Sequence, residues 1–463
     1  MQPLKAALAT LKHMIPAVGV AILAGAVSFT ALYVSPVPMI QDFGKMLKLG
    51  VIISFLVSIL LLVPLLFVRD KLFASEKEYK MGQRQQVTGI DIFLSALVKR
   101  VLTMGVIIIF LAITLTGLGL WGDSRVGVQT DVEKFMPQGT QELKDIHLLR
   151  EVLGTTDQLV VMYRGQDLLT EENLVWIEQV TEEIKTKYPE VVSTKSITSV
   201  LKKTNNDELP NVRDTEDILG DLPQDQIKML LTEDRSMGAI LVGVEHMEAQ
   251  KMKFFIDDLN SFVLDNGQEG LEITVTGKSV LDVEMITALT TGRYQMTLLG
   301  IGLVFLVLLV VYRHPIKALI AILPISFIIG WSGGIMYLLG LEYTPLTATL
   351  GALVIGIGTE FTILIMERFY EERKKGVQTE EAIVVAIRKI GKAILASGLT
   401  VIGGFSALII SDFIILRDFG LMTVINMSLS LISTLVVLPP ILVLLDRFVK
   451  TKSVTVETKE LCQ

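Results

Sequence analysis

The sequence predicts a polytopic α-helical membrane protein that carries one extracytoplasmic α/β domain. Hydrophobic residues make up 51% of the chain and charged residues only 20%, which is more apolar surface than a soluble domain of this length buries. Apolar runs of about 20 residues, the length that crosses a bilayer as a helix, recur along the chain. One long polar insert, residues 122–291, separates these runs into two groups.

We expect about eight membrane spans from the apolar runs. The first run lacks an Ala-x-Ala-like exit and a second run follows it closely, so we interpret it as a permanent anchor and not as a cleavable signal. The expected spans are 15–34, 47–68, 101–121, 296–312, 316–341, 345–366, 394–410 and 421–445.

Lysine and arginine in the short connections predict the orientation. They concentrate ahead of the first span and in the connections 69–100, 313–317 and 368–392, which all fall on one side if the spans alternate. Because cytoplasmic loops are rich in these residues, both termini should be cytoplasmic and the insert should lie outside the cytoplasmic membrane. The connection 367–392 has an apolar helical face and should lie along the cytoplasmic interface as an amphipathic helix.

Several chemistries find no support in the composition. The single Cys462 lies next to the C-terminus and the four histidines have no metal-ligand spacing, so we expect no cofactor and no metal. The net charge of −7 gives no reason to expect a nucleic-acid partner. In the insert, Asp157, Glu284 and His246 suit a solvated surface better than a catalytic set, so we do not expect an enzyme.

The motif Asp-Phe-Gly occurs twice, at residues 42–44 and 418–420. It also marks the magnesium-binding turn of protein kinases, but the sequence lacks the glycine-rich loop, strand lysine and His-Arg-Asp loop that a kinase needs. Shifting the chain by 376 positions instead aligns two whole hairpins without a gap and pairs Ser35 with Ser411. We interpret the motif as part of an internal repeat, the usual construction of secondary transporters.

The repeat predicts how the chain is organised. Four spans and the insert precede the second hairpin, whereas the first hairpin starts the sequence, so the chain should correspond to the end of one repeat and a complete second repeat. Each motif stands at an outer turn, where Asp42 and Asp418 should cap the helix that re-enters the membrane. The expected parts are the last two spans of a first repeat (1–72), a cytoplasmic linker (73–98), the first span of the second repeat (99–121), the extracytoplasmic domain (122–291), three spans (292–366), the amphipathic linker (367–392), a final two-span hairpin (393–447) and a cytoplasmic tail (448–463).

The insert has the pattern of a compact α/β domain. The stretches "DQLVVMYRG" and "VVSTKSITS" alternate as strands do, and they flank a helical pattern with Thr170 as its expected N-cap. A polar stretch, expected to form a mobile loop with a short helix, follows. After it, "SMGAILVGVE", a second helix and "GLEITVTG" repeat the strand, helix, strand order. Two such units fit a ferredoxin-like fold of split β-α-β units.

The whole chain resembles the resistance, nodulation and division (RND) superfamily, and within it the MMPL and hydrophobe/amphiphile efflux branch that shares the sterol-sensing pattern. The most specific stretches are Gly356-Ile357-Gly358 followed by an acid, and the Ser-Asp-x-x-x-x-Arg-Asp-Phe-Gly hairpin with its Pro-Pro exit helix. The resemblance implies proton-driven export of lipids and amphiphiles by about twelve spans and two outside porter domains built as repeats. This chain would then supply the fifth to the last span and the second porter domain.

Glu360 is the candidate proton-relay residue. It is the ionisable side chain well inside an apolar span, where a charge costs roughly 2.5 to 3.5 kcal/mol on insertion scales and burial favours the protonated form. The resemblance implies the same role, although the family has aspartate and tyrosine where this chain has Glu360-Phe361. The alternative is a polar residue satisfied within the bundle or reaching the cytoplasmic interface. The neighbouring Gly351, Gly356 and Gly358 should let helices approach closely.

Three functions stay open from the sequence. The first is a proton-driven exporter of hydrophobic or amphiphilic molecules that works in the lipid bilayer with a first-half polypeptide or as a homo-oligomer. The second is a non-transporting membrane module that binds lipids or a partner, as sterol-sensing proteins do. The third is a protein-export accessory of the SecDF kind, which shares the superfamily fold but whose usual motifs are missing from this sequence.

Overall fold

The computed structural model describes residues 3–62, 64–65, 68–69, 89–129, 133, 136–137, 139–153, 155 and 157–449. Most of the expected linker 73–98, the end of the expected tail and Cys462 lie outside these residues. The chain forms two units, which are taken separately below. Unit 1 is Met1–Val128 with Ala288–Gln463, and unit 2 is Gln129–Thr287.

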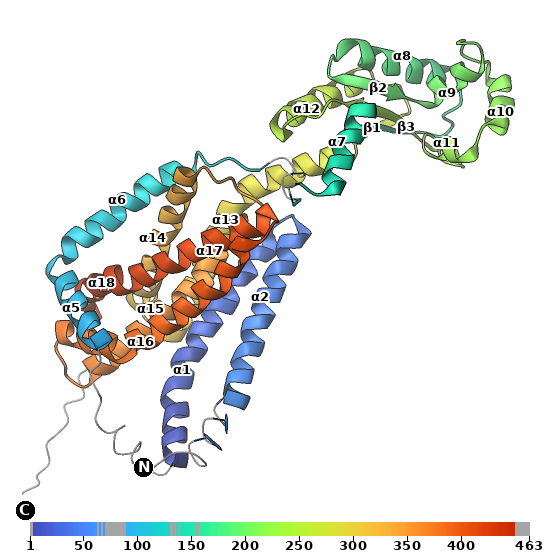
Figure 1. The fold of residues 1–463 in the computed structure, drawn as a ribbon. Coiled ribbons are helices and arrows are strands. Elements are labelled where there is room, and N and C mark those ends of the chain that lie inside the picture. The colour runs from blue at the N-terminus through green and yellow to red at the C-terminus, as the bar shows by residue number, and fades with distance from the viewer. Residues whose placement is uncertain are drawn as a thin grey trace, which may run out of the picture. The chain divides into compact units, whose positions relative to one another are not determined.

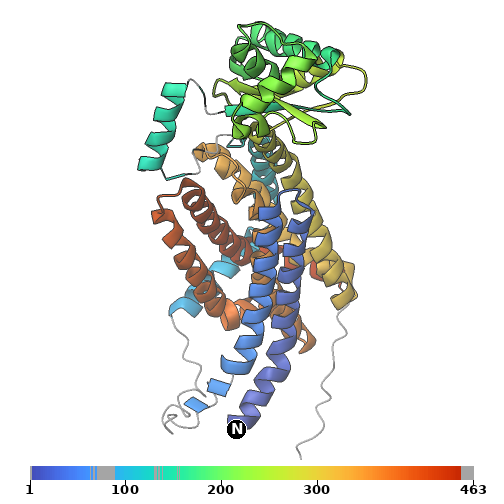
Figure 2. The ribbon, with the colours of Figure 1, turned by 90° about the vertical axis from the view of Figure 1, so that its right-hand side faces the viewer.

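Unit 1 is a bundle of long apolar helices (Figures 1 and 2). Within the described residues, eight helical segments are long and apolar enough to cross a membrane, as the hydropathy of the sequence predicts. The helices are α1 (Pro3–Thr30), α2 (Pro38–Val57), α5 (Gly89–Thr103), α6 (Gly105–Asp123), α13 (Lys278–Tyr312), α14 (Pro315–Leu339), α15 (Leu350–Lys374), α16 (Thr379–Ser406), α17 (Ile414–Ile432) and α18 (Leu438–Asp446). Short 3-10 turns are η1 (Ala31–Val34), η4 (Thr347–Thr349) and η5 (Ala407–Ile410), and π-helical turns are η2 (Ser58–Leu62) and η6 (Ser433–Val437).

Helix α15 forms the centre of this bundle. It contacts α1, α14, α16 and α17, and most of its apolar residues are buried. The expected interfacial helix 367–392 differs from the structure, because α15 runs on to Lys374 and α16 begins at Thr379 as one continuous helix. Its apolar face, including Ala382 and Ile387, is fully buried. That face therefore packs inside the protein and does not lie on lipid headgroups.

The structure reproduces the internal repeat at the level of single turns. Helices α1 and α16 end at residues 30 and 406, and each continues into a four-residue 3-10 turn, η1 or η5. After each turn a serine hydroxyl accepts a hydrogen bond of 3.2 Å from the backbone N–H two residues later, from Val37 to Ser35 and from Phe413 to Ser411. The following helices α2 and α17 both end in a π-helical turn. The helix ends, the 3-10 turns and the serines follow the offset of 376 positions that the sequence shows, and the π-helical turns follow it to within one residue.

The glycine and phenylalanine of the repeated motif have packing roles. A Cβ atom on Gly44 would lie 2.8 Å from Leu32 Cβ, and one on Gly420 would lie 2.6 Å from the equivalent Leu408 Cβ. Only glycine therefore lets each helix fold back tightly on the preceding turn. The rings of the two motif phenylalanines, Phe43 and Phe419, meet edge to face with centroids 5.9 Å apart, so the two hairpins touch each other.

The capping role expected for the two motif aspartates is wrong. The N-cap residues of α2 and α17 are Val37 and Phe413, and neither helix has a side-chain cap. Asp42 lies one turn inside α2, is exposed and pairs with Lys45 at 2.8 Å. Asp418 lies one turn inside α17 and is buried at 9% exposure. Ser35 and Ser411, in the turns before the two helices, accept hydrogen bonds from the backbone N–H groups of Val37 and Phe413.

Unit 2 is built around a four-stranded antiparallel sheet in the order β2-β3-β1-β4. Strands β1 and β2, which a helix connects, are separated in the sheet by β3. Strands β3 and β4, which a second helix connects, are separated by β1. This is the split β-α-β arrangement. The elements are α7 (Gln141–Leu153), β1 (Asp157–Arg164), α8 (Glu171–Lys187), β2 (Val191–Lys195), α9 (Ile197–Thr204), α10 (Val212–Asp221), α11 (Gln224–Lys228), β3 (Met237–Val244), α12 (Ala249–Asp265) and β4 (Glu272–Thr276).

Local signals explain where the elements of unit 2 begin and end. Thr170 caps α8 as predicted, with its hydroxyl accepting from the Asn173 backbone N–H. Strand β2 is shorter than expected because Ser196 forms a capping box with Ser199 and starts α9. The polar stretch expected to be a loop with one short helix forms two helices, α10 and α11.

Candidate functional site

Glu360 lies in the middle of α15, on the helix face that packs against α1. Two contacts define this interface. A Cβ atom added to Gly25 would lie 3.2 Å from the Gly356 carbonyl oxygen, and the Ser28 hydroxyl donates to the Ala352 carbonyl oxygen at 3.3 Å. One further turn along these antiparallel helices brings Glu360 to the level of the buried Ala21.

The Glu360 carboxyl group is partly buried and, among the described residues, no side chain donates a hydrogen bond or forms an ion pair to it. The neighbouring hydroxyl groups serve the helix backbone instead. Thr359 donates to the Ile355 carbonyl at 2.7 Å and Thr362 to the Gly358 carbonyl at 3.2 Å. Phe361 is 1% exposed and offers no polar atom.

The three glycines near Glu360 each face a different helix. A Cβ atom on Gly351 would lie 2.3 Å from Thr297 Oγ1 of α13, and one on Gly356 would lie 2.7 Å from Ser28 Oγ of α1. A Cβ atom on Gly358 would lie 3.2 Å from the Ser430 hydroxyl of α17. These distances support the interpretation that the glycines allow close helix packing.

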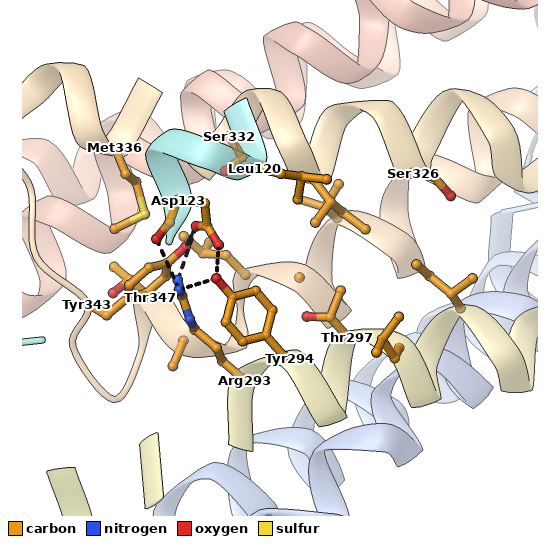
Figure 3. A pocket seen from close by; sticks show the side chains of 17 residues that line it. Leu120, Asp123, Arg293, Tyr294, Thr297, Ser326, Ser332, Met336, Tyr343 and Thr347 are labelled. Carbon is orange, nitrogen blue, oxygen red and sulfur yellow. Dashed lines mark hydrogen bonds and ion pairs between the residues drawn. The ribbon is translucent and has the colours of Figure 1, made fainter. Parts of the chain in front are cut away.

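A cluster of charged and phenolic groups, which the sequence did not predict, lies where α6 ends (Figure 3). Asp123, the last residue of α6, pairs with Arg293 of α13 at 3.1 Å, and the two residues are 6% and 7% exposed. Tyr294 and Tyr343 each donate a hydrogen bond of 2.6 Å to the Asp123 carboxylate. We call these four residues the Asp123 cluster.

Packing holds the Asp123 cluster in one geometry. The guanidinium group of Arg293 lies over the ring of Tyr343 at 3.7 Å and near the ring of Tyr294 at 4.4 Å. Gly333 of α14 faces Asp123 so closely that a Cβ atom there would lie 2.3 Å from the carboxylate. Burial, together with the Asp123 carboxylate, raises the pKa of Tyr343, so its phenol remains a hydrogen-bond donor. The Nε atom of Arg293 is buried and has no hydrogen-bond partner among the described residues.

A cavity of about 260 Å³ adjoins the Asp123 cluster between α6, α13, α14 and α15. Its walls are mainly apolar, and hydroxyl groups of Thr297, Ser326, Ser332 and Thr347 are spaced along it (Figure 3). Because Asp123 and Arg293 neutralise each other, the polar end of the cavity carries no net charge. Apolar walls with a few convergent polar groups are typical of small-molecule binding sites.

The sequence contained only a weak signal for this cluster. Asp123 follows the predicted span 101–121 and Arg293 precedes the predicted span 296–312, and charges near span ends are ordinary interfacial residues. In the insert, Asp157 and His246 form a hydrogen-bonded pair at 2.6 Å near the end of the sheet, and both side chains are partly exposed. Glu284 lies on α13 and is exposed.

The MMPL family model matches residues 134–460 of this chain. Among curated relatives, the putative membrane protein MJ1562 of Methanocaldococcus jannaschii is 27% identical over 337 residues, which cover 70% of this chain and 87% of that protein. The probable transport protein MmpL9 of Mycobacterium tuberculosis is 30% identical over 186 residues, which cover 39% of this chain and 19% of that protein.

Two solved structures share the fold at low sequence identity. The hedgehog release protein Disp from the water bear Hypsibius dujardini has a TM-score of 0.66 at 15% identity, covering 94% of this chain and 59% of that chain. SecDF, a translocon-associated membrane protein from Thermus thermophilus, has a TM-score of 0.52 at 14% identity, covering 96% of this chain and 50% of that chain. The chain therefore spans little more than half the length of these proteins.

The family match extends over most of the chain, and the described residues include eight helical segments long and apolar enough to cross a membrane, among them the repeated hairpins that the resemblance rests on. Transport proteins are among the relatives that match. Together these findings show that the chain is a membrane protein of the MMPL family, in the resistance, nodulation and division superfamily.

Proposed function

We propose that this chain forms the second-half core of a proton-driven exporter of hydrophobic or amphiphilic molecules in the cytoplasmic membrane. The observation that carries the proposal is Glu360, an acid without a fixed partner at the middle of the central helix α15. Membership of a family that includes transport proteins supports it. In this proposal both termini are cytoplasmic, unit 2 is an extracytoplasmic porter domain of ferredoxin-like topology, and the domain boundaries, apart from the linker 367–392, follow those expected from the sequence.

Proton binding at Glu360 would act on the packing of α1 against α15. The charged carboxylate needs hydration, whereas the neutral acid tolerates the apolar interface that Gly25, Ser28 and Gly356 create. Loading and releasing a proton would therefore change how closely the two helices approach. A first-half polypeptide or a second copy of the chain would supply the polar group that faces Glu360 in the deprotonated state.

The cavity beside the Asp123 cluster is the proposed contact for the transported molecule. Its apolar wall suits hydrocarbon, and its neutral polar end suits a head group that exchanges hydrogen bonds without bringing an unpaired charge. This chemistry favours an amphiphile over a free ion.

The test is transport by the Glu360→Gln variant in proteoliposomes under an imposed pH gradient. The probe is a phospholipid with a nitrobenzoxadiazole (NBD) label, whose movement between leaflets is read by its accessibility to dithionite. We expect the variant to lose gradient-driven movement while expression and folding persist, because glutamine cannot release a proton. The matched control is Glu342→Gln, an exposed acid outside the spans, which should transport normally. Equal gradient-driven movement by Glu360→Gln and the unmodified protein would refute the proposal.

A non-transporting lipid-binding module is the second candidate, and Phe361 is the observation that favours it. The ring is buried where the family has a tyrosine, so a hydroxyl group beside the acid is missing from this chain. Such a module would bind the labelled phospholipid equally at pH 6 and pH 8 and would show no gradient-driven movement, even with Glu360 intact. The same proteoliposome experiment therefore separates the two functions.

A further inference from the structure

An apolar groove of about 590 Å³ runs along the side of α6 that faces away from the Asp123 cluster. Its floor is formed by α6 and α14, and its far wall by α17 with the π-helical turn η6. Trp121, Gly122 and Tyr337 lie at one end, and Leu115 and Trp331 lie further along it. Almost no polar surface lines the groove, so it suits a hydrocarbon chain.

Glycines give the groove its depth. A Cβ atom on Gly119 would lie 2.1 Å from the Gly330 carbonyl oxygen, and one on Gly334 would lie 2.8 Å from the Gly119 Cα atom. Helices α6 and α14 therefore meet backbone to backbone, and the large side chains of both helices stand at the edges of the contact. A chain lying in the groove would rest on this smooth backbone surface.

The end of the groove at Trp121 carries a cation. The guanidinium group of Arg125 lies 3.9 Å from the centroid of the Trp121 ring, and its side chain is exposed. No carboxylate among the described residues pairs with it, and the nearby Asp123 is already held by Arg293. The rings of Trp121 and Tyr337 meet edge to face at 6.1 Å. Tryptophan, tyrosine and arginine together are typical of the membrane–water interface.

From this placement we propose that the groove binds an anionic glycerophospholipid, with an acyl chain between α6, α14 and α17 and the phosphate group on Arg125. The aromatic pair would hold the glycerol region, where both apolar and polar surfaces are needed. A zwitterionic lipid carries a positive group close to its phosphate, so it gains less from Arg125 than a lipid with net negative charge. The site lies on the opposite face of α6 and α14 from the cavity of the proposed transport route.

Tryptophan fluorescence of the full chain can report this binding directly. The chain has three tryptophans, of which Trp121 and Trp331 line the groove. Trp176 is 7% exposed in unit 2 and gives a constant background. The purified protein in detergent micelles is titrated with lipids that carry bromine on the acyl chains, which quench a tryptophan only on contact. The two probes are brominated phosphatidylglycerol and brominated phosphatidylcholine.

We expect half-maximal quenching at an about fivefold lower mole fraction of phosphatidylglycerol, which corresponds to about 1 kcal/mol for one cation near the surface. Arg125→Gln should abolish this preference, and Arg125→Glu should reverse it. Arg447→Gln is the matched control, because Arg447 is another exposed arginine stacked on a ring, at 4.8 Å from Phe448, and it should leave the preference unchanged. Soluble glycerol phosphate should not relieve the quenching, because it lacks the chain.

Three outcomes would overturn the proposal. Equal quenching by both lipids in the unmodified protein would show that the groove does not select a negative head group. A preference for phosphatidylglycerol that survives in Arg125→Gln and Arg125→Glu would show that another part of the surface holds the phosphate. Relief of quenching by glycerol phosphate would identify a soluble anion, and not a lipid, as the ligand of Arg125.

Discussion

Replacing Asp123 by asparagine removes the negative charge that balances Arg293 inside the helical unit. The arginine would then stand as an unpaired charge at 7% exposure, and breaking one side of a buried pair costs about 3–5 kcal/mol. Asparagine still accepts one of the two hydrogen bonds of 2.6 Å that the tyrosines donate, so we place the cost at the lower end, about 3 kcal/mol. Removing both charges in Asp123→Leu/Arg293→Met should cost far less than this, because neither charge is then buried alone.

Reversible unfolding in mixed micelles, measured for the single variants Asp123→Leu and Arg293→Met and for the double variant, gives the coupling between the two residues. We expect the double variant to recover at least about 2 kcal/mol relative to the sum of the single losses. Stabilities that simply add, with Asp123→Asn losing under about 1 kcal/mol, would show that the pair is hydrated and does not hold α6 to α13.

Two further predictions concern the hairpins and unit 2. Gly420→Ala should destabilise the chain by about 1–3 kcal/mol, because the new methyl group meets Leu408. Gly404→Ala on α16 is the control: its methyl group meets no atom within 4 Å, so the change should be neutral or stabilising. Equal effects of the two changes in the same unfolding assay would contradict the packing role of the motif. Burial raises the pKa of Tyr163, and burial with the acceptor Asp258 raises that of Tyr188, so the folded state keeps protons that the unfolded state loses above about pH 10. The free energy of unfolding of unit 2, followed by Trp176 fluorescence, should therefore fall as the pH rises through 10. The fall should be smaller in Tyr188→Phe. An unchanged free energy of unfolding between pH 9 and 11 would refute the prediction.

The helical fold was predictable from the sequence because the bilayer imposes length and hydropathy on each span. Boundaries were less predictable where a charged surface and an apolar core share one helix. The expected linker 367–392 carries lysine and arginine beside an apolar face, which suggested an interfacial segment, yet Ile383 and Ile387 are buried and the helix runs on into the bundle. Tertiary packing, and not hydropathy, decides such a position.

Of the two candidate sites, one could be predicted from the sequence and the other could not. Glu360 could be found because a lone acid in an apolar run is unusual in itself. The Asp123 cluster could not, because Asp123 and Arg293 are 170 residues apart in sequence and each stands at the end of a span, where charges are common. Asp42 and Asp418 were wrongly expected to be N-caps because the sequence placed them in the outer turns. In the structure α2 and α17 begin one turn earlier, so both aspartates lie inside the helices.

The two hairpins share one backbone plan but have unequal surroundings. On α17, Met422, Asn426 and Ser430 are fully buried, and Ser430 faces Gly358 of α15. Their counterparts on α2 are Met46, Gly50 and Ser54, and all three are exposed.

The exposed residues of α2 therefore form a surface equivalent to the one that α17 buries against its neighbours. A helix laid on it as α15 lies on α17 must place a residue without a side chain opposite Ser54, just as Gly358 stands opposite Ser430. A helix that packs on α2 in this way can therefore be recognised in a sequence by a glycine at the position equivalent to Gly358.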